Sequence, residues 1–375
     1  MSSNSRIRLS AALAGLAALA IPLAACGSDT EGEVSAGMGN ATPKPAASSD
    51  AAEPAGEVTA LDAGVTGALR VGDRILLRAG DSVLSGTPDD PAMDVNDVDA
   101  ACGELAPAGD VAVLPCPDGI HVLTSDGSGT AVIGRGDAYT AAVGLSDGRI
   151  IGHRADSDRV DVFGADGEHA DDFAVSRHGS QLLSVPSDRD GAVLVEVNRP
   201  ETSLHEIILD ESRAGSGLRA GIAVGPVDVG SDGTIAAVDA RGGQLLIYTA
   251  DDVIRLHNST PVPEGPWAVM VDVPRGLVWV TSTVDGLLTA YDITTGTALQ
   301  AAQLPTVADA QALAPAGRGG LVAYSATGDG AQVIDAATID AALEEGREDL
   351  EAERELMDPR EPVDRLPSGE DSDGE

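Results

Sequence analysis

The chain repeats a pattern of about 43 residues, and this repeat constrains the fold more than any other feature of the sequence. Glycines in short polar turns mark the repeat at Gly148, Gly191, Gly233, Gly276 and Gly319. Their successive intervals are 43, 42, 43 and 43 residues. Around Gly276, the apolar runs 268–273, 277–281 and 287–291 predict three strands joined by tight turns, where glycine adopts a positive φ at low cost.

A period of about 40–45 residues with several short strands in each unit is typical of a β-propeller. Each unit is a small antiparallel sheet that buries its faces by stacking against its neighbours around a ring. Two weaker units precede the regular ones, but Gly72 and Gly119 are 47 residues apart and Gly119 and Gly148 only 29. We therefore predict an all-β propeller of seven blades; six blades, or an ordinary β-sandwich, are the alternatives.

The propeller is predicted to occupy residues 58–336. Its last unit has no clear fourth strand, whereas residues 57–61 are a spare extended segment ahead of the first unit. We expect this segment to close the ring by pairing with the last blade. Residues 337–375 are expected to form a short helix and then a disordered acidic tail. The apolar stripe of that helix is Ile339, Leu343, Leu350 and Leu356.

The N-terminus has the organisation of an export signal. Arg6 and Arg8 precede the apolar stretch 9–23, and small residues lead to Cys26. The sequence Leu23-Ala24-Ala25-Cys26 resembles the lipobox of bacterial lipoproteins. This resemblance implies that residues 1–25 are a signal peptide and that Cys26 is acylated, which anchors the chain in the lipid bilayer on the extracytoplasmic side of the cell membrane. Residues 26–57, rich in Gly, Ser, Ala and Pro, then read as a flexible tether.

Two further cysteines, Cys102 and Cys116, remain in a chain that we expect to be exported. Such a pair predicts a disulfide. A structural zinc site needs four ligands, and the pair alone lacks two of them. The acidic run 89–99 offers oxygen ligands but lacks the Gly and Glu of a calcium-binding loop, so we interpret it as a solvated loop. We predict no metal and no cofactor.

The chain is strongly acidic, with a formal net charge of −38. Removal of Arg6 and Arg8 with the signal peptide makes this −40. Such a charge disfavours binding to nucleic acid and docking on an anionic membrane surface. We expect a monomer, and the abundance of Ala, Gly, Arg and Asp suggests a GC-rich, actinobacterial genome.

The stretch 267–296 resembles the YVTN/lactonase-like propeller repeat. The resemblance lies in Gly265-Pro266, the apolar run 269–273, Gly276, Val278-Trp279-Val280 and the sequence Tyr291-Asp292-Ile293-Thr294-Thr295-Gly296. It implies the fold, and some members of the family are enzymes. Together with the lipobox, the chain looks like the propeller lipoproteins of actinobacterial envelopes.

Propellers bind ligands at the central mouth, so we expect the binding face where the innermost strands begin. The candidate residues are Tyr139, Gln181, Asp228, Trp267 and Gln311. The sequence contains no nucleophile–base pair, metal cluster or cofactor motif that we recognise. It therefore favours a non-catalytic module that binds an envelope protein or glycan. The alternative is a propeller enzyme, of lactonase-like or other hydrolase type, that acts at the mouth.

Overall fold

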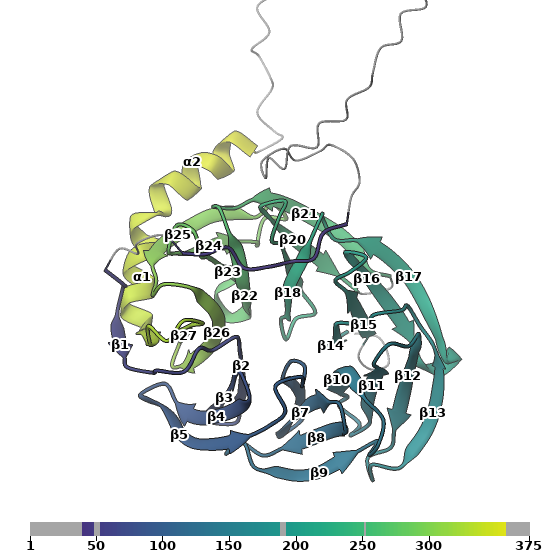
Figure 1. Cartoon of the computed structure of the whole chain (residues 1–375). Helices are drawn as coiled ribbons and strands as arrows, with labels where there is room; N and C mark the ends of the chain where they lie inside the picture. Colours follow the sequence, from purple (N-terminus) through teal and green to yellow (C-terminus); the bar gives the residue numbers. More distant parts are fainter. Residues whose placement is uncertain (1–39, 49–52, 188–192, 251–252, 358–375) are drawn as a thin grey trace, which may run out of the picture. The chain divides into compact units, whose positions relative to one another are not determined.

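Seven antiparallel sheets of four strands each surround a common centre in the computed structural model (Figure 1). The structure describes residues 40–48, 53–187, 193–250 and 253–357. The fold is therefore the predicted β-propeller with seven blades. The signal peptide, Cys26 and the acidic tail 358–375 lie outside the described residues, and their predictions are untested.

Blades 1 to 4 follow one another along the chain. Blade 1 consists of β2 (Gly67–Val71), β3 (Arg74–Ala79), β4 (Ser82–Thr87) and β5 (Asp90–Asp97). Blade 2 consists of β6 (Ala106–Ala108), β7 (Val111–Cys116), β8 (Gly119–Leu123) and β9 (Gly129–Ile133). Blade 3 consists of β10 (Tyr139–Gly144), β11 (Ile150–Arg154), β12 (Arg159–Phe163) and β13 (His169–Ala174). Blade 4 consists of β14 (Gln181–Val185), β15 (Val193–Asn198), β16 (Ser203–Ile208) and β17 (Arg213–Arg219).

Blades 5 to 7 complete the ring. Blade 5 consists of β18 (Val224–Val229), β19 (Ile235–Asp239), β20 (Gln244–Thr249) and β21 (Arg255–Pro261). Blade 6 consists of β22 (Pro266–Asp272), β23 (Leu277–Ser282), β24 (Leu287–Asp292) and β25 (Leu299–Pro305). Blade 7 consists of β26 (Ala310–Gly317), β27 (Gly320–Ser325), β28 (Ala331–Ile334) and β1 (Glu57–Thr59). Two short 3-10 turns, Leu209–Glu211 and Val273–Arg275, connect strands in blades 4 and 6.

The turn between the first and second strand of a blade contains the glycine that marks the repeat. Gly148, Gly233, Gly276 and Gly319 all have positive φ there, between 65° and 88°. In blade 2 the equivalent residue is Gly109, with φ 66°, and Gly119 belongs to the next turn of the same blade. The spacing looked irregular because Gly119 was counted in place of Gly109. The strand before Gly109, β6, is only three residues long and has no apolar run that marks it in the sequence.

The hydrophobic core is divided into seven clusters, and each cluster joins two neighbouring blades. Aliphatic residues dominate every cluster, which agrees with an aromatic content of only 2%. Burial between adjacent sheets is the main favourable contribution of such packing. Each blade buries its faces against its two neighbours, so the packing joins the blades into a ring.

The N-terminal strand β1 closes the ring. Val58 pairs with Gln332 of β28, so the first strand of the chain forms the outermost strand of the last blade. The buried side chain of Gln332 donates to the carbonyl oxygens of Ala55 and Pro305, at 2.7 and 2.9 Å, and accepts from the Val307 N–H at 2.9 Å. The predicted closure by residues 57–61 is confirmed for Glu57–Thr59.

Residues 40–48, part of the expected tether, lie against the propeller and cross in front of blades 5 and 6 (Figure 1). The Ala41 N–H donates to the Ile222 carbonyl at 3.0 Å, and the Thr283 hydroxyl donates to the Ala46 carbonyl at 2.8 Å. Ser48 exchanges two hydrogen bonds with Asp309. This segment thus spans the loops on the face where the innermost strands begin, which we call the entry face.

Two helices follow blade 7. α1 (Ala336–Glu345) begins at Asp335, whose carboxylate accepts from the Thr338 N–H at 2.8 Å, and α2 (Arg347–Met357) follows Gly346. Ile339 is buried in the hydrophobic cluster between blades 6 and 7. Leu343 and Leu350 pack against the same cluster. Leu356 is exposed, because it follows Leu350 by six residues in the same helix and so faces about 120° away from it. None of the described helices is long and apolar enough to cross a bilayer.

Candidate functional site

β-Bulges recur at the entry ends of four innermost strands. In blades 3, 5, 6 and 7, the first strand has one residue more than its partner before the pairing becomes regular. A bulge bends the strand and turns a side chain to a new direction, and bulges are frequent at barrel rims and beside functional sites. The bulged segments include Thr140, Pro226, Trp267 and Gln311, none of which is buried.

Gln181 occupies the same place at the start of β14, where the pairing is regular, and it is half-buried. We define the entry mouth as Thr140, Gln181, Pro226, Trp267 and Gln311. Three of the five residues predicted from the sequence belong to it. The structure thus brings Gln181, Trp267 and Gln311 to one end of the ring, on three different blades.

Tyr139 does not share this surface. Its side chain is only 3% exposed and lies between blades 2 and 3, where its hydroxyl donates to Asp161 at 2.7 Å. Arg154 also binds the buried Asp161 carboxylate with two hydrogen bonds of 2.7 Å. Burial and this carboxylate raise the pKa of the Tyr139 hydroxyl well above its ordinary value. Thr140 is the extra residue of the bulge between Tyr139 and Ala141, and its side chain is the exposed one.

Asp228 is also placed away from the entry mouth. It lies near the other end of β18, and its carboxylate accepts from the Val271 N–H of β22 at 2.8 Å. Burial raises the pKa of Asp228 to about 6, although hydrogen bonds from the backbone act in the opposite direction. Its contact joins the innermost strands of blades 5 and 6, so its role in the structure is to connect blades.

Trp267 is the exception among the aromatic residues. The chain has eight of them, and the other seven are buried in the clusters between blades, with at most 6% of the side chain exposed: Tyr139, Phe163, Phe173, Tyr248, Trp279, Tyr291 and Tyr324. Trp279 is fully buried, and its indole N–H donates to Asp272 at 3.4 Å. Partly exposed tryptophan is enriched at binding interfaces.

An ion pair that the sequence does not predict joins two loops at the entry mouth. Arg199, in the loop after β15, contacts Glu104, in the loop before β6, with N–O distances of 2.8 and 3.1 Å. Its guanidinium also donates to the Gln181 side-chain oxygen at 3.3 Å, and the Gln181 amide donates to the Val227 carbonyl at 2.9 Å. Blades 2 and 4 are not neighbours, so loops from them meet only near the axis of the ring.

The carboxyl group of Glu196 is buried between blades 3 and 4. Glu196 has no exposed surface, and one of its oxygens accepts from the Ser176 hydroxyl and lies 3.5 Å from His153 Nε2. Its other oxygen has no hydrogen-bond partner among the described residues. Burial raises the pKa of Glu196, and its contacts with Ser176 and His153 offset this only in part. His153 is fully buried as well.

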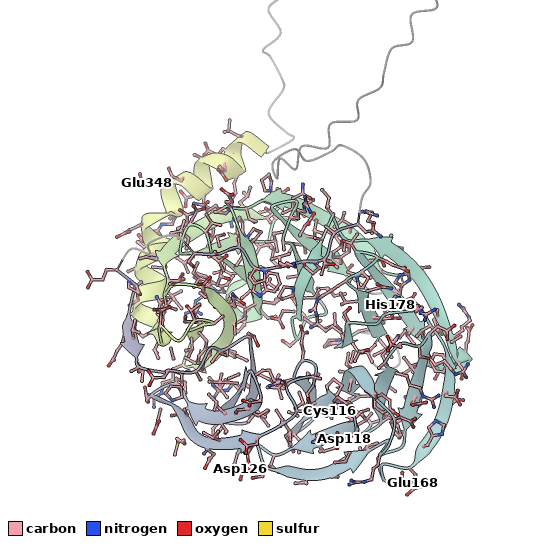
Figure 2. All side chains as sticks on the ribbon, viewed as in Figure 1. Cys116, Asp118, Asp126, Glu168, His178 and Glu348 are labelled. Carbon is pink, nitrogen blue, oxygen red and sulfur yellow. A yellow bond between two sulfur atoms is a disulfide. The ribbon has the colours of Figure 1, made fainter. Side chains whose placement is uncertain are left out.

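The disulfide between Cys102 and Cys116 is present, as predicted. Within the part of the chain that the structure describes, one group of side chains could hold a metal ion: Cys116, Asp118 and His121 of blade 2. The turn after β7, which contains Asp118, lies at the end of blade 2 where β6 begins, on the entry face. In Figure 2, Cys116 and Asp118 lie close together on blade 2.

A surface cavity of about 390 Å³ lies between the two C-terminal helices and blade 6. Four of its charged side chains are paired with one another: Arg275 contacts Asp340 at 3.4 Å, and Arg354 contacts Asp292. These pairs fasten the helices to the propeller. The cavity therefore reads as a consequence of helix packing.

No protein-family model matches the chain, and neither does any curated protein. Several solved structures are similar to it in fold. Kuenenia stuttgartiensis hydrazine synthase is 13% identical, with 75% of this chain and 98% of that chain covered and a TM-score of 0.60. A streptogramin B lyase is 14% identical, with 73% and 94% covered and a TM-score of 0.55. The protein U3-55K is 12% identical, with 76% and 100% covered and a TM-score of 0.57.

These similarities place the chain among the β-propellers. At such low identity the likeness concerns the fold alone. The three structures carry the names of a synthase, a lyase and U3-55K, so the shared fold does not select one function. The resemblance to the YVTN/lactonase-like repeat is accordingly supported at the level of the propeller.

Proposed function

We propose that this protein is an exported propeller, anchored to the cell membrane through lipid on Cys26, that binds an envelope protein or glycan at the entry mouth without catalysis. The observation that carries the binding site is Trp267. It is the one aromatic side chain outside the buried clusters, and a bulge holds it at the entry end of β22. Loops and strand ends on a rigid scaffold are common places for recognition.

The entry mouth supplies the chemistry that such a partner needs. Trp267 offers a flat apolar surface, and Gln181 and Gln311 offer amide donors and acceptors. The Glu104 carboxylate lies beside the mouth and is paired with Arg199. This set favours recognition by stacking and neutral hydrogen bonds, which suits a sugar ring or a peptide backbone.

The position of residues 40–48 supports a membrane-proximal partner. Asn40 follows Cys26 by 14 residues, which span at most about 50 Å when fully extended. Since this segment is bound to the entry face, a lipid on Cys26 would keep that face within about 50 Å of the bilayer. The partner would then be a membrane protein or a glycan close to the membrane.

The experiment is photo-crosslinking of the full-length protein in its own cells. A photoreactive amino acid replaces Gln311, and the captured species is analysed for protein and glycan. We expect Trp267→Ala to reduce capture at least tenfold while the melting temperature stays within a few degrees, because the side chain is partly exposed.

Leu256→Ala is the matched control. Leu256 is 48% exposed on the outermost strand of blade 5, so its removal deletes a similar apolar surface away from the mouth. Its variant should keep full capture. Equal capture by the Trp267 variant and the wild type would move the interface away from the entry mouth.

A further inference from the structure

The fold brings an aspartate and a histidine to the disulfide of blade 2. Cys116 ends β7, Asp118 lies in the turn that follows, and His121 lies in β8. One ligand atom from each of these residues lies within 4.8 Å of the other two. Asp118 Oδ1 and His121 Nε2 are 2.7 Å apart. A sulfur, a carboxylate oxygen and an imidazole nitrogen thus converge at one point.

Cys102 supplies a fourth candidate ligand, since its sulfur is bonded to that of Cys116. The sequence argued against zinc because two cysteines lack two further ligands. Asp118 in the turn after β7 and His121 in β8 provide them, which the spacing of the cysteines alone does not reveal. Two sulfurs, one imidazole and one carboxylate are ligands that Zn²⁺ binds in tetrahedral sites.

The site is accessible from the surface on one side. A cavity of about 400 Å³ is lined by Asp97, Val98, Asp99, Pro117, Asp118 and His121. The Cys116 sulfur lies on the buried side, whereas the Asp118 side chain is 64% exposed and that of His121 24%. The acids Asp97 and Asp99 at the rim give the entrance a negative potential, which attracts divalent cations.

We propose that Cys102, Cys116, Asp118 and His121 form a zinc site when the disulfide is reduced. A dithiol reductant gives two electrons and two protons to the Cys102–Cys116 bond, which becomes two thiols, and the dithiol becomes a cyclic disulfide. Zn²⁺ then binds both sulfurs as thiolates and releases their two protons. The disulfide and the zinc site exclude each other, because a sulfur in a disulfide is not a thiolate ligand.

The test uses the purified folded protein and Co²⁺ as a spectroscopic substitute for Zn²⁺. The disulfide is reduced with a phosphine, which takes up an oxygen atom from water and becomes a phosphine oxide. We expect one Co²⁺ per chain, with the intense visible bands of tetrahedral cobalt and an ultraviolet sulfur-to-cobalt band. Addition of Zn²⁺ should remove these bands, and the oxidised protein should not show them.

Two variants separate this site from chance binding to thiols. His121→Ala and Asp118→Ala should each weaken Co²⁺ binding at least about tenfold, since even groups that only support a ligand contribute about 10–100-fold. His178→Asn is the matched control, because it removes an exposed imidazole elsewhere, and Asn tolerates the positive φ of 71° at that position. Its affinity should equal that of the wild type.

The thermal stability of the reduced protein provides a second measurement. If reduction loosens blade 2, Zn²⁺ should raise the melting temperature of the reduced protein and leave that of the oxidised protein unchanged. The proposal is overturned if the reduced protein shows neither sulfur–cobalt bands nor stabilisation by Zn²⁺. It is equally overturned if the His121 and Asp118 variants bind Co²⁺ as tightly as the wild type.

Discussion

Single buried polar side chains join neighbouring blades by binding backbone groups. Asp239, at the end of β19, is 1% exposed and accepts from the N–H groups of Ile222, Ala223 and Gly242 at 2.7 to 2.9 Å. It thereby connects the loop between blades 4 and 5 to the turn before β20. A Cβ atom at Gly242 would lie 2.0 Å from its carboxylate, so glycine is required there. Gln332 does the same where the ring closes.

The titration of Asp228 should make stability depend on pH. Its pKa is about 6 in the folded protein against an ordinary 3.8, so the folded state retains a proton that the unfolded state loses. This contribution is complete below about pH 4 and disappears as the pH rises through about 6. Asp228→Asn keeps an acceptor for the Val271 N–H but does not titrate. We expect the free energy of unfolding to fall about 1–2 kcal/mol more in the wild type than in this variant between about pH 4 and pH 7.5.

Denaturant unfolding of both proteins at the two pH values measures this difference. Its sign is diagnostic, because a carboxylate stabilised by ion pairing would give the opposite slope. Parallel pH profiles for the two proteins would show that Asp228 has an ordinary pKa in the folded state.

At the residue scale, the sequence could predict which strands approach the mouth but not which side chains face it. Alternation along a strand assigns Tyr139 or Thr140 to the surface equally well, and one extra residue in a bulge decides between them. The bulge is a feature of the pairing with β11, so it has no signature in β10 itself. The contact between Arg199 and Glu104 could not be predicted from the sequence either, because it joins loops of two blades that meet only in the closed ring.

At the scale of the strand, turn glycines predicted most of the architecture. The hairpin between the first and second strand needs a positive φ in each blade, so the glycine recurs wherever that hairpin keeps its length. Blade 2 follows the rule through Gly109, but its first strand β6 has only three residues and contains Pro107, so the hairpin was not recognisable in the sequence. This short first strand was therefore the one that the sequence did not reveal.

Truncation from the N-terminus tests the closing strand. A chain that begins at residue 53 lacks the segment 40–48 but keeps β1, whereas one that begins at residue 60 lacks β1 as well. Loss of β1 exposes the edge of β28 and leaves Gln332 without its Ala55 partner. We expect the second truncation to cost about 2 kcal/mol or more beyond the first. Thermal melts of the two chains should separate, and identical melting temperatures would contradict closure by this strand.

At the scale of the whole molecule, the N-terminal segment ties the fold to the proposed anchor. The segment 40–48 contains Lys44, the only lysine of the chain, and it is exposed. Its hydrogen bonds to the loops before β18 and β26 and after β23 fix where the chain leaves the propeller. With the proposed lipid on Cys26, the entry face would set the direction in which the propeller approaches the membrane.

Metabolic labelling tests the anchor. We expect a palmitate analogue to label the protein in its own cells and Cys26→Ala to abolish the label and release the protein into the medium. Cys102→Ser is the matched control, because it removes a cysteine that the anchor does not use. A wild-type protein found wholly in the medium would rule out lipid anchoring.

The pairing of β1 with β28 also has a consequence for how the molecule is made. Val58 is among the first residues of the propeller to be synthesised, and its partner Gln332 follows 274 residues later. Contacts between such distant parts of a chain form slowly, because the intervening loop must first be closed. Until blade 7 arrives, the first strand has no partner and the edge of the first blade stays open. The pairing of β1 with β28 is thus the last contact of the ring that can form. A chain that ends before blade 7 cannot close the ring, and its strand edges stay accessible to proteases and to other chains.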